Sequence, residues 1–171
     1  MFDGLVHPGA ILIIGGLSLL GLRGLTRQVF SILIPAAALL VAWKLPLDAS
    51  WTIGFLDYQL NPIKIDRLSR IFSIIFTLMA TVGAIYSLRQ SSKLELPAAL
   101  TYAGSAIGVA LAGDWITAFV FWECMAIGST LVIWSANTSA SERAAGRYIM
   151  VHLLGGVILF GRNWESREQL T

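Results

Sequence analysis

The sequence predicts an all-α membrane protein of about six transmembrane helices, with a short β-hairpin between the second and the third. Of its 171 residues, 56% are hydrophobic and only 13% are charged, and the mean hydropathy is +0.73. Soluble domains carry about a quarter of charged residues. The hydrophobic residues also fall into separate segments divided by short polar connections. A soluble chain of this size could not cover so much apolar surface, so lipid is the expected solvent.

The expected spans follow from the apolar segments. A helix needs about 17–25 residues to cross a bilayer, and the third, fourth and fifth segments meet this length. The second segment is shorter and contains Pro35, which predicts a kink. Trp43, Trp115 and Trp134 end several segments, as expected of side chains at the headgroup level. In chain order the segments are 5–22, 29–43, 71–88, 96–112, 115–134 and 144–160.

One long connection, residues 44–70, interrupts this pattern. Residues 51–60 are rich in β-branched and aromatic side chains, and residues 63–66 alternate strictly between apolar and polar. The turn signal Asn61-Pro62 stands between them, which predicts a β-hairpin with its turn at that point.

Residues 1–161 are expected to form one bundle, and residues 162–171 a polar tail. The start, Met1-Phe2-Asp3-Gly4, lacks a basic leader, so the first apolar segment is interpreted as a retained helix. The composition of the sequence changes abruptly from apolar to polar after Gly161. This change indicates either a natural solvated end or a truncated or frame-shifted product.

The positive-inside rule places the N-terminus outside. One set of connections holds Lys44, Lys64, Arg67 and Arg70, with Arg162 and Arg167 in the tail on the same side. The opposite set leads by six to four when only the connections are counted, and the two sides are equal when the tail is included. The members of the richer set are Arg23, Arg27, Arg89, Lys93, Arg143 and Arg147.

Glu123 is the most informative residue, because it is the ninth of the twenty residues from Trp115 to Trp134. A charged side chain near the middle of a bilayer costs roughly 3 kcal/mol or more. Intramembrane acids therefore usually carry protons or ions. The alternative is a structural, protonated glutamate bonded to a neighbouring helix.

His152 is the second candidate. By rise along their helices, Glu123 lies about 16 Å and His152 about 12 Å deep, and a short loop makes the two helices antiparallel neighbours. Histidine is a natural proton relay. The alternative is a neutral histidine bonded to a backbone carbonyl. His7 is interpreted as interfacial, and its different depth disfavours a haem site shared with His152.

Thr117, Ser129 and Thr130 of the fifth segment are candidates for the polar lining of a pathway, or they bond carbonyls of their own helix. The pairs Gly104/Gly108 and Gly155-Gly156 predict close helix packing. Cys124 is the single cysteine, so an intrachain disulfide is excluded.

No phosphate loop, metal cluster or nucleophile triad occurs in the sequence. No catalytic centre, metal or cofactor of its own is therefore expected, and no nucleic acid as a partner.

Three local motifs resemble the N-terminal part of the antiporter-like membrane subunits. This family includes the D subunit of Mrp-type sodium/proton antiporters and the proton-pumping subunits of complex I and of membrane-bound hydrogenases. The motifs are Asp66-Arg67-Leu68-Ser69-Arg70, Phe121-Trp122-Glu123, and Arg147-Tyr148 with His152 and Gly155-Gly156.

The resemblance implies that Glu123 is the fifth-helix glutamate of a proton half-channel, which in the family pairs with a lysine on the seventh helix. This chain ends before that helix, so a truncated or frame-shifted member is expected. The expected function is a component of a proton or cation pathway, in an Mrp-like antiporter or a proton-translocating NADH-quinone oxidoreductase-like complex. The alternative is a non-transporting structural or assembly membrane subunit.

The expected partners are the bilayer, other membrane subunits, protons and Na⁺. The expected location is a bacterial or archaeal inner or plasma membrane, which the chain crosses several times.

Overall fold

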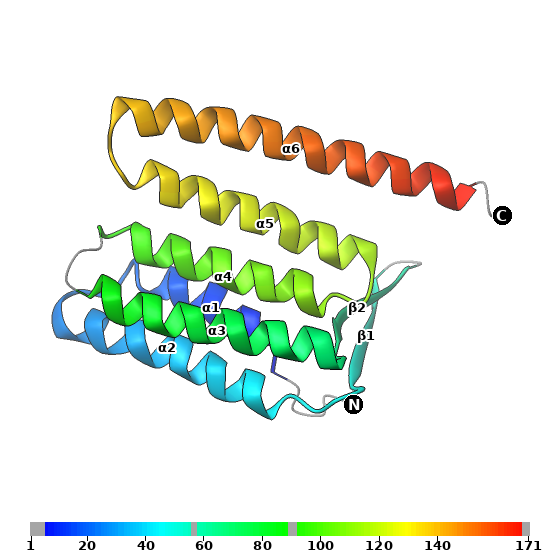
Figure 1. Ribbon diagram of the computed structural model, residues 1–171, viewed down its shortest axis with the longest axis horizontal. Coiled ribbons are helices and arrows are strands. Elements are labelled where there is room, and N and C mark those ends of the chain that lie inside the picture. The colour runs from blue at the N-terminus through cyan, green and yellow to red at the C-terminus, as the bar shows by residue number, and fades with distance from the viewer. Residues whose placement is uncertain (1–5, 56–57, 89–91, 169–171) are drawn as a thin grey trace.

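The computed structural model describes residues 6–55, 58–88 and 92–168. Within them the chain forms six helices and a two-stranded antiparallel sheet (Figure 1). Arg89 and the start Met1-Phe2-Asp3-Gly4 lie outside the described residues, as do the last three residues of the polar tail. The elements are α1 (Pro8–Ser18), α2 (Gly24–Lys44), β1 (Ser50–Phe55), β2 (Tyr58–Lys64), α3 (Arg67–Ser87), α4 (Glu95–Leu111), α5 (Trp115–Trp134) and α6 (Ser139–Glu168).

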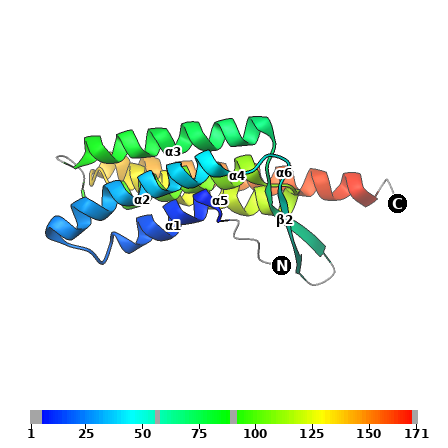
Figure 2. The ribbon, with the colours of Figure 1, turned by 90° about the horizontal axis from the view of Figure 1, so that it is seen from below.

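The helices run side by side, and the hairpin lies across one end of the bundle (Figures 1 and 2). α4 occupies the middle, in contact with α1, α3 and α5, and α2 packs on α1 and α3. α6 packs on α5 and forms one edge of the bundle (Figure 1). The fold class expected from the sequence, a helical bundle with a hairpin between its second and third helices, is confirmed.

The helix bounds differ from the predicted segments mainly at α1, α2 and α6. α1 covers only 11 residues. α2 begins at Gly24, before the predicted apolar segment, and includes Arg27 and Gln28, both residue types that favour helices. The helix continues through Pro35 to Lys44. α6 continues to Glu168, so the change to polar composition after Gly161 does not end the helix.

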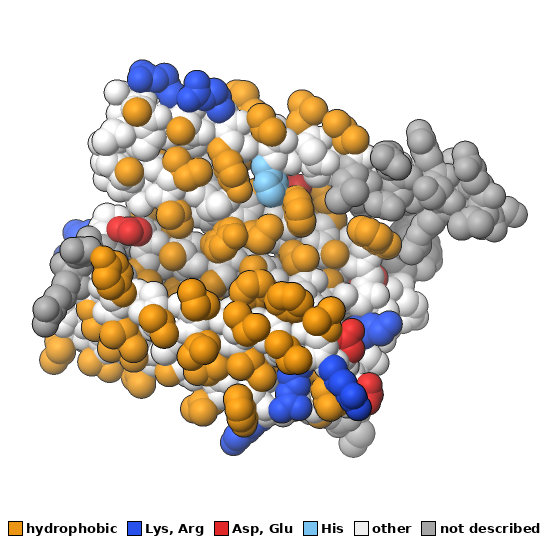
Figure 3. All heavy atoms as spheres, in the orientation of Figure 1, with side chains coloured by type: hydrophobic (Ala, Val, Ile, Leu, Met, Phe, Trp, Pro, Cys, Tyr) orange, Lys and Arg blue, Asp and Glu red, His pale blue; other side chains and the backbone are white. Residues whose placement is uncertain are grey.

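Three helices, α2, α3 and α5, are long and apolar enough to cross a membrane, and α1 and α4 are shorter apolar helices. Large hydrophobic side chains remain exposed along the bundle, and charged side chains gather near its ends (Figure 3). Trp43, Trp115 and Trp134, at the helix ends, are more than half exposed, as expected at the interface. Lipid contact accounts for this surface, and the chain is an integral membrane protein.

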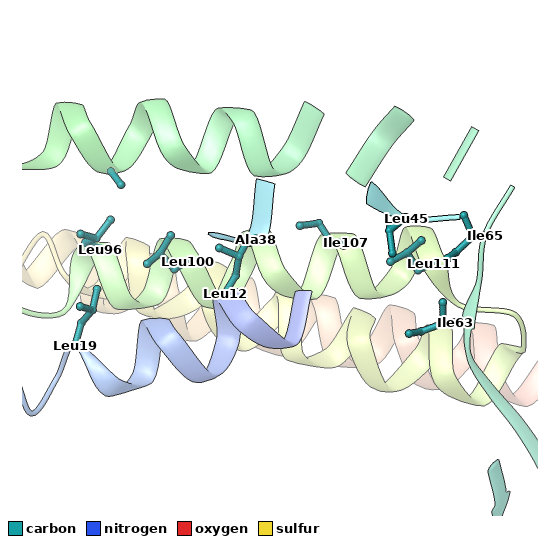
Figure 4. Packing of buried hydrophobic residues seen from close by; sticks show 11 residues of the cluster. Leu12, Leu19, Ala38, Leu45, Ile63, Ile65, Leu96, Leu100, Ile107 and Leu111 are labelled. Carbon is teal, nitrogen blue, oxygen red and sulfur yellow. The ribbon is translucent and has the colours of Figure 1, made fainter. Parts of the chain in front are cut away.

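The core lies between α1, α2 and α4 and continues beneath the hairpin (Figure 4). Ile63 and Ile65 of the hairpin region join Leu45 and Leu111 there, so the hairpin packs as part of the bundle. The other buried members are Leu12, Leu19, Ala38, Ala84, Leu96, Leu100 and Ile107.

Glycines set the spacing of the central helices, as the small-residue pattern predicts. A Cβ added at Gly104 would overlap the backbone of Gly9 in α1. A Cβ at Gly108 would overlap the ring of Phe121, and one at Gly128 would lie 2.8 Å from the backbone nitrogen of Tyr102. The backbones of α1, α4 and α5 therefore approach more closely than larger residues would permit.

The hairpin is confirmed, but its predicted turn at Asn61-Pro62 is wrong. Phe55 pairs with Tyr58, so the reversal falls between them, and Asn61 and Pro62 lie inside β2. The ladder is irregular there, between Trp51 and Ile53 of β1. Because proline lacks an N–H to donate, it is tolerated in a strand at such a bulge.

Candidate functional site

The candidate site is the α5–α6 seam, which we define by Trp122 and Glu123 of α5 and by Tyr148, His152 and Gly156 of α6. Figure 3 shows a histidine and an acidic side chain in the region between these two helices, surrounded by hydrophobic side chains. The seam lies at the edge of the bundle, because it is formed by α5 and α6 and α6 is the helix at that edge.

Glu123 extends from α5 onto the backbone of α6. A Cβ added at Gly156 would overlap Glu123 Oε1 and would lie 3.4 Å from its Cδ. Both carboxyl oxygens are buried and have no hydrogen-bond partner among the described residues. The bare backbone of Gly156 thus provides the space that the carboxyl group occupies.

His152 lies four residues, about one helical turn, before Gly156, which is about 6 Å along α6. Its ring centroid is 5.4 Å from that of Trp122, the neighbour of Glu123, and 5.8 Å from that of Tyr148. Nε2 of His152 is buried and also has no partner among the described residues. The structure therefore brings both predicted proton-pathway residues, Glu123 and His152, to the same pair of helices.

Tyr148 links the two helices nearer the start of α6. Its hydroxyl lies 3.0 Å from Ser129 Oγ, which is also 2.9 Å from the carbonyl oxygen of Ala126. Ser129 can donate to the carbonyl while it accepts from Tyr148. Thr130 donates to the same carbonyl at 2.7 Å. Of the two interpretations of these hydroxyls, bonding within the helix describes what the structure shows.

Thr117 contributes to the start of α5 instead. Its Oγ1 and N–H donate to Asp114 Oδ2 and Oδ1 at 2.6 and 2.8 Å, which caps the helix. The N–H of Asn61, in the hairpin bulge, donates to Asp114 Oδ2 at 2.6 Å, and Gly113 N donates to Asn61 O at 2.8 Å. We call these residues, 61 and 113–117, the hairpin corner.

The electrostatics of the hairpin corner follow from these bonds. Burial tends to raise the pKa of Asp114, but the hydrogen bonds from Thr117 and Asn61 outweigh it and hold the pKa below its ordinary value of 3.8. The carboxylate therefore stays ionised, which favours the helix N-terminus it caps.

The first resemblance motif has a structural role at the start of α3. Asp66 accepts from the N–H of Ser69 at 2.7 Å, and Ser69 Oγ accepts from the N–H of Asp66 at 2.9 Å. This capping box lowers the pKa of Asp66, mainly through the Ser69 N–H. Arg70 donates to the carbonyl oxygen of Trp43 at 2.7 Å, and Arg67 is exposed.

His7, which was predicted to be interfacial, packs inside the bundle. Its Nδ1 accepts from the N–H of Ala10 at 3.2 Å, so it caps α1, and its ring stacks on Phe121 at 5.3 Å. Phe121 lies six residues, about 9 Å, into α5, so α1 begins well inside the bundle. The sequence signal was Pro8, because proline favours the first turn of a helix and makes the preceding residue the cap.

The remaining predicted positions divide between the seam and its surroundings. Phe121 faces α1 and α4, away from Glu123, and Trp122 is 38% exposed. Gly155 faces open space, unlike Gly156. Among the described residues no three His, Cys, Asp or Glu side chains are grouped to hold a metal ion.

The sequence is similar to proteins named "Putative antiporter subunit mnhA2" from Staphylococcus aureus. The proteins of strains MSSA476, MW2 and JH9 are each 31% identical to it over 137 residues, which is 76% of this chain. The chain spans 17% of the length of these relatives. No protein-family model matches the sequence. Over about three quarters of its length, then, this integral membrane protein is similar in sequence to proteins that carry the name of antiporter subunits.

Proposed function

We propose that this chain is an antiporter-like membrane subunit that contributes Glu123 to a pathway for protons or cations. The observation that carries the proposal is the position of its carboxyl group, which is buried in the α5–α6 seam with neither oxygen hydrogen-bonded to a described residue. The relatives' name supports a role in cation transport.

The surroundings of Glu123 support the proposal of proton carriage. A buried carboxyl group without a partner is easier to accommodate when it is neutral, whereas an approaching cation or water favours the charged form. In the proposal, Glu123 exchanges its proton as such a partner arrives and leaves. A carboxyl group held permanently by hydrogen-bond donors could not respond in this way.

His152 is the proposed exchange partner. It lies one turn from Gly156, on which the Glu123 carboxyl rests, and its Nε2 is also unpartnered. A rotation of either side chain, or one bridging water, would connect the two groups. The rings of Trp122 and Tyr148 pack against the imidazole.

The finer assignment is part of the same proposal. It places the chain in an Mrp-like or complex I-like assembly, in contact with other membrane subunits, with its N-terminus outside. The relatives above carry the name mnhA2, while the resemblance motifs favour the D subunit. Which of these subunits the chain corresponds to is decided by the partners with which it co-purifies.

The proposal is tested by infrared difference spectroscopy of the purified chain in lipid, recorded as the pH is changed. A band of a protonated carboxylic acid that disappears in Glu123→Gln, and shifts in frequency in Glu123→Asp, is the expected result. Glu142→Gln is the matched control, because Glu142 is an exposed glutamate at the start of α6. An unchanged spectrum in Glu123→Gln would contradict proton carriage by this residue.

The second candidate is a non-transporting structural or assembly subunit. The lack of a lysine in the interior of any described helix favours it, because Glu123 then has no lysine partner within the described helices. Proton flux into liposomes that contain the chain and its co-purifying subunits separates the two. Flux that Glu123→Gln abolishes supports the pathway, and equal flux in both proteins supports the structural role.

A further inference from the structure

One face of α6 carries a hollow that shares Tyr148 and His152 with the seam and extends beyond it to Ala144, Arg147 and Val151. Its volume is about 420 Å³, and the residues that line it recur every three or four positions along one face of the helix. We call it the headgroup hollow, and it is lined by Ala144, Arg147, Tyr148, Val151 and His152.

The hollow combines a cationic end with an apolar floor. Arg147 is exposed at one end, and Arg143 is exposed one helical turn earlier, about 6 Å along the axis. Neither guanidinium has a hydrogen bond or ion pair to any residue that the structure describes. In the other direction the surface becomes purely apolar, since Val151 is 74% and Leu154 is 65% exposed.

The position of Arg147 along α6, below the level of Trp134, indicates that its guanidinium requires a partner. The next residue, Tyr148, lies within 3.0 Å of Ser129, which precedes the interfacial Trp134 by five residues, roughly 7.5 Å of helix. Arg147 thus starts below the level of the tryptophan ring. An unpaired guanidinium there is costly unless its long side chain reaches a charged partner nearer the surface.

We propose that the headgroup hollow, together with the exposed Arg143 and Leu154 beside it on α6, binds an anionic phospholipid, with its phosphate between Arg143 and Arg147 and an acyl chain along Val151 and Leu154. Arginine binds phosphate oxygens through paired N–H donors, and two guanidinia one turn apart can share one phosphate. Basic pockets at the ends of transmembrane helices bind lipid headgroups in this manner. Figure 3 shows basic side chains gathered over the start of α6, next to hydrophobic surface.

Glu142, which is exposed next to Arg143, is the nearest described carboxylate in the sequence. It is turned by about 140° from Arg147 around the helix, so it does not occupy the position of the phosphate. The proposal does not depend on proton transport, because the residues that would hold the lipid, Arg143, Arg147, Val151 and Leu154, have no role in the proposed pathway.

The test is native mass spectrometry of the purified full chain in a neutral detergent, titrated with phosphatidylglycerol or with phosphatidylcholine of the same acyl chains. The wild type is expected to retain one phosphatidylglycerol in preference to phosphatidylcholine. The double variant Arg143→Gln/Arg147→Gln is expected to weaken that retention about fivefold or more, since two surface ion pairs are lost. Inorganic phosphate at millimolar concentration is expected not to compete.

Arg23→Gln is the matched control, because Arg23 is exposed at the same end of the bundle but lies away from the hollow. Equal retention of the two lipids, an undiminished affinity in the double variant, or an equal loss in Arg23→Gln would overturn the proposal. Competition by inorganic phosphate would also overturn it, in favour of a simple anion site. Should the double variant fold poorly, the single variant Arg147→Gln and Val151→Glu, which places a negative charge in the hollow, provide the same comparison.

Discussion

Gly156 of α6 lies beneath the carboxyl group of Glu123 of α5, and any side chain at that position would overlap Oε1. The preceding residue, Gly155, faces open space. Two adjacent glycines in one helix thus have opposite surroundings, and only one of them is required by the carboxyl group. This contrast allows the seating of Glu123 to be tested without changing Glu123 itself.

We expect Gly156→Ala to displace the Glu123 carboxyl group and to destabilise the bundle by about 1 kcal/mol, the low end of the cost of overpacking, because the atom it would meet is the end of a flexible side chain. Gly155→Ala should be neutral or stabilising by up to about 1 kcal/mol, because alanine favours the helix. Thermal unfolding in detergent measures both. Equal effects of the two substitutions would show that Gly156 does not seat the carboxyl group.

The proposed pathway predicts a graded response at Glu123. In the parent assembly, Glu123→Ala and Glu123→Gln should remove most proton uptake, because neither side chain can release a proton. Glu123→Asp should retain part of it, because the acid is kept but withdrawn by one methylene. The measurement is proton uptake into membrane vesicles at matched expression, and similar activity in all three variants would refute the prediction.

Tyr148 and Ser129 provide a separate measure of how firmly α6 is attached to α5. Tyr148→Phe and Ser129→Ala should each destabilise the bundle slightly, and the double variant should cost less than the sum of the two. The expected coupling energy is about 0.6 kcal/mol, typical of hydrogen bonds between membrane helices. A double-mutant cycle of unfolding free energies measures it. Strict additivity would mean that the 3.0 Å approach of the two hydroxyls contributes nothing.

The hairpin corner should respond both to substitution and to pH. Asp114→Ala removes the cap of α5 and the bond to Asn61, with an expected cost of about 1–2 kcal/mol, whereas Asp114→Asn can still cap and should cost less. The pKa of Asp114 is lower in the folded protein than its ordinary value of 3.8. Its contribution is therefore complete above that value and is lost as the pH falls through the lower folded pKa.

Unfolding measured between neutral and strongly acidic pH checks this. The wild type should lose more stability than Asp114→Asn across the acidic range. A parallel loss in the two proteins would show that Asp114 contributes no pH dependence.

The sequence predicted α5 well because both of its ends carry local signals. Asp114 is a capping residue, and Trp115 and Trp134 mark the two interfaces. The hairpin turn was misplaced for the opposite reason. Asn61-Pro62 is a strong local turn signal, yet Asn61 is held by Gly113 and Asp114, which are distant in the sequence. A tertiary contact overrode the local preference there.

The candidate site also combines a feature that local sequence signals predict with features that depend on tertiary contacts. The depth of Glu123 follows from counting residues, so its position within α5 was predictable. Its contact with Gly156 was not, because the rotation of α6 against α5 depends on how the two surfaces fit together. The burial of His7 was missed because it requires α1 to begin beside Phe121, a level that hydropathy does not encode.

Asp114 and Glu123 are nine residues apart on one helix, which corresponds to about two and a half turns. Their carboxyl groups therefore point to opposite sides of α5, one toward the hairpin and the other toward α6. The cap at Asp114 fixes the rotation of α5 about its own axis at that end, and with it the direction in which Glu123 points. Inserting or deleting one residue between these two positions would leave the cap intact but turn Glu123 by about 100° away from Gly156. The number of residues between Asp114 and Glu123 therefore determines the contact with Gly156, just as the identity of Glu123 does.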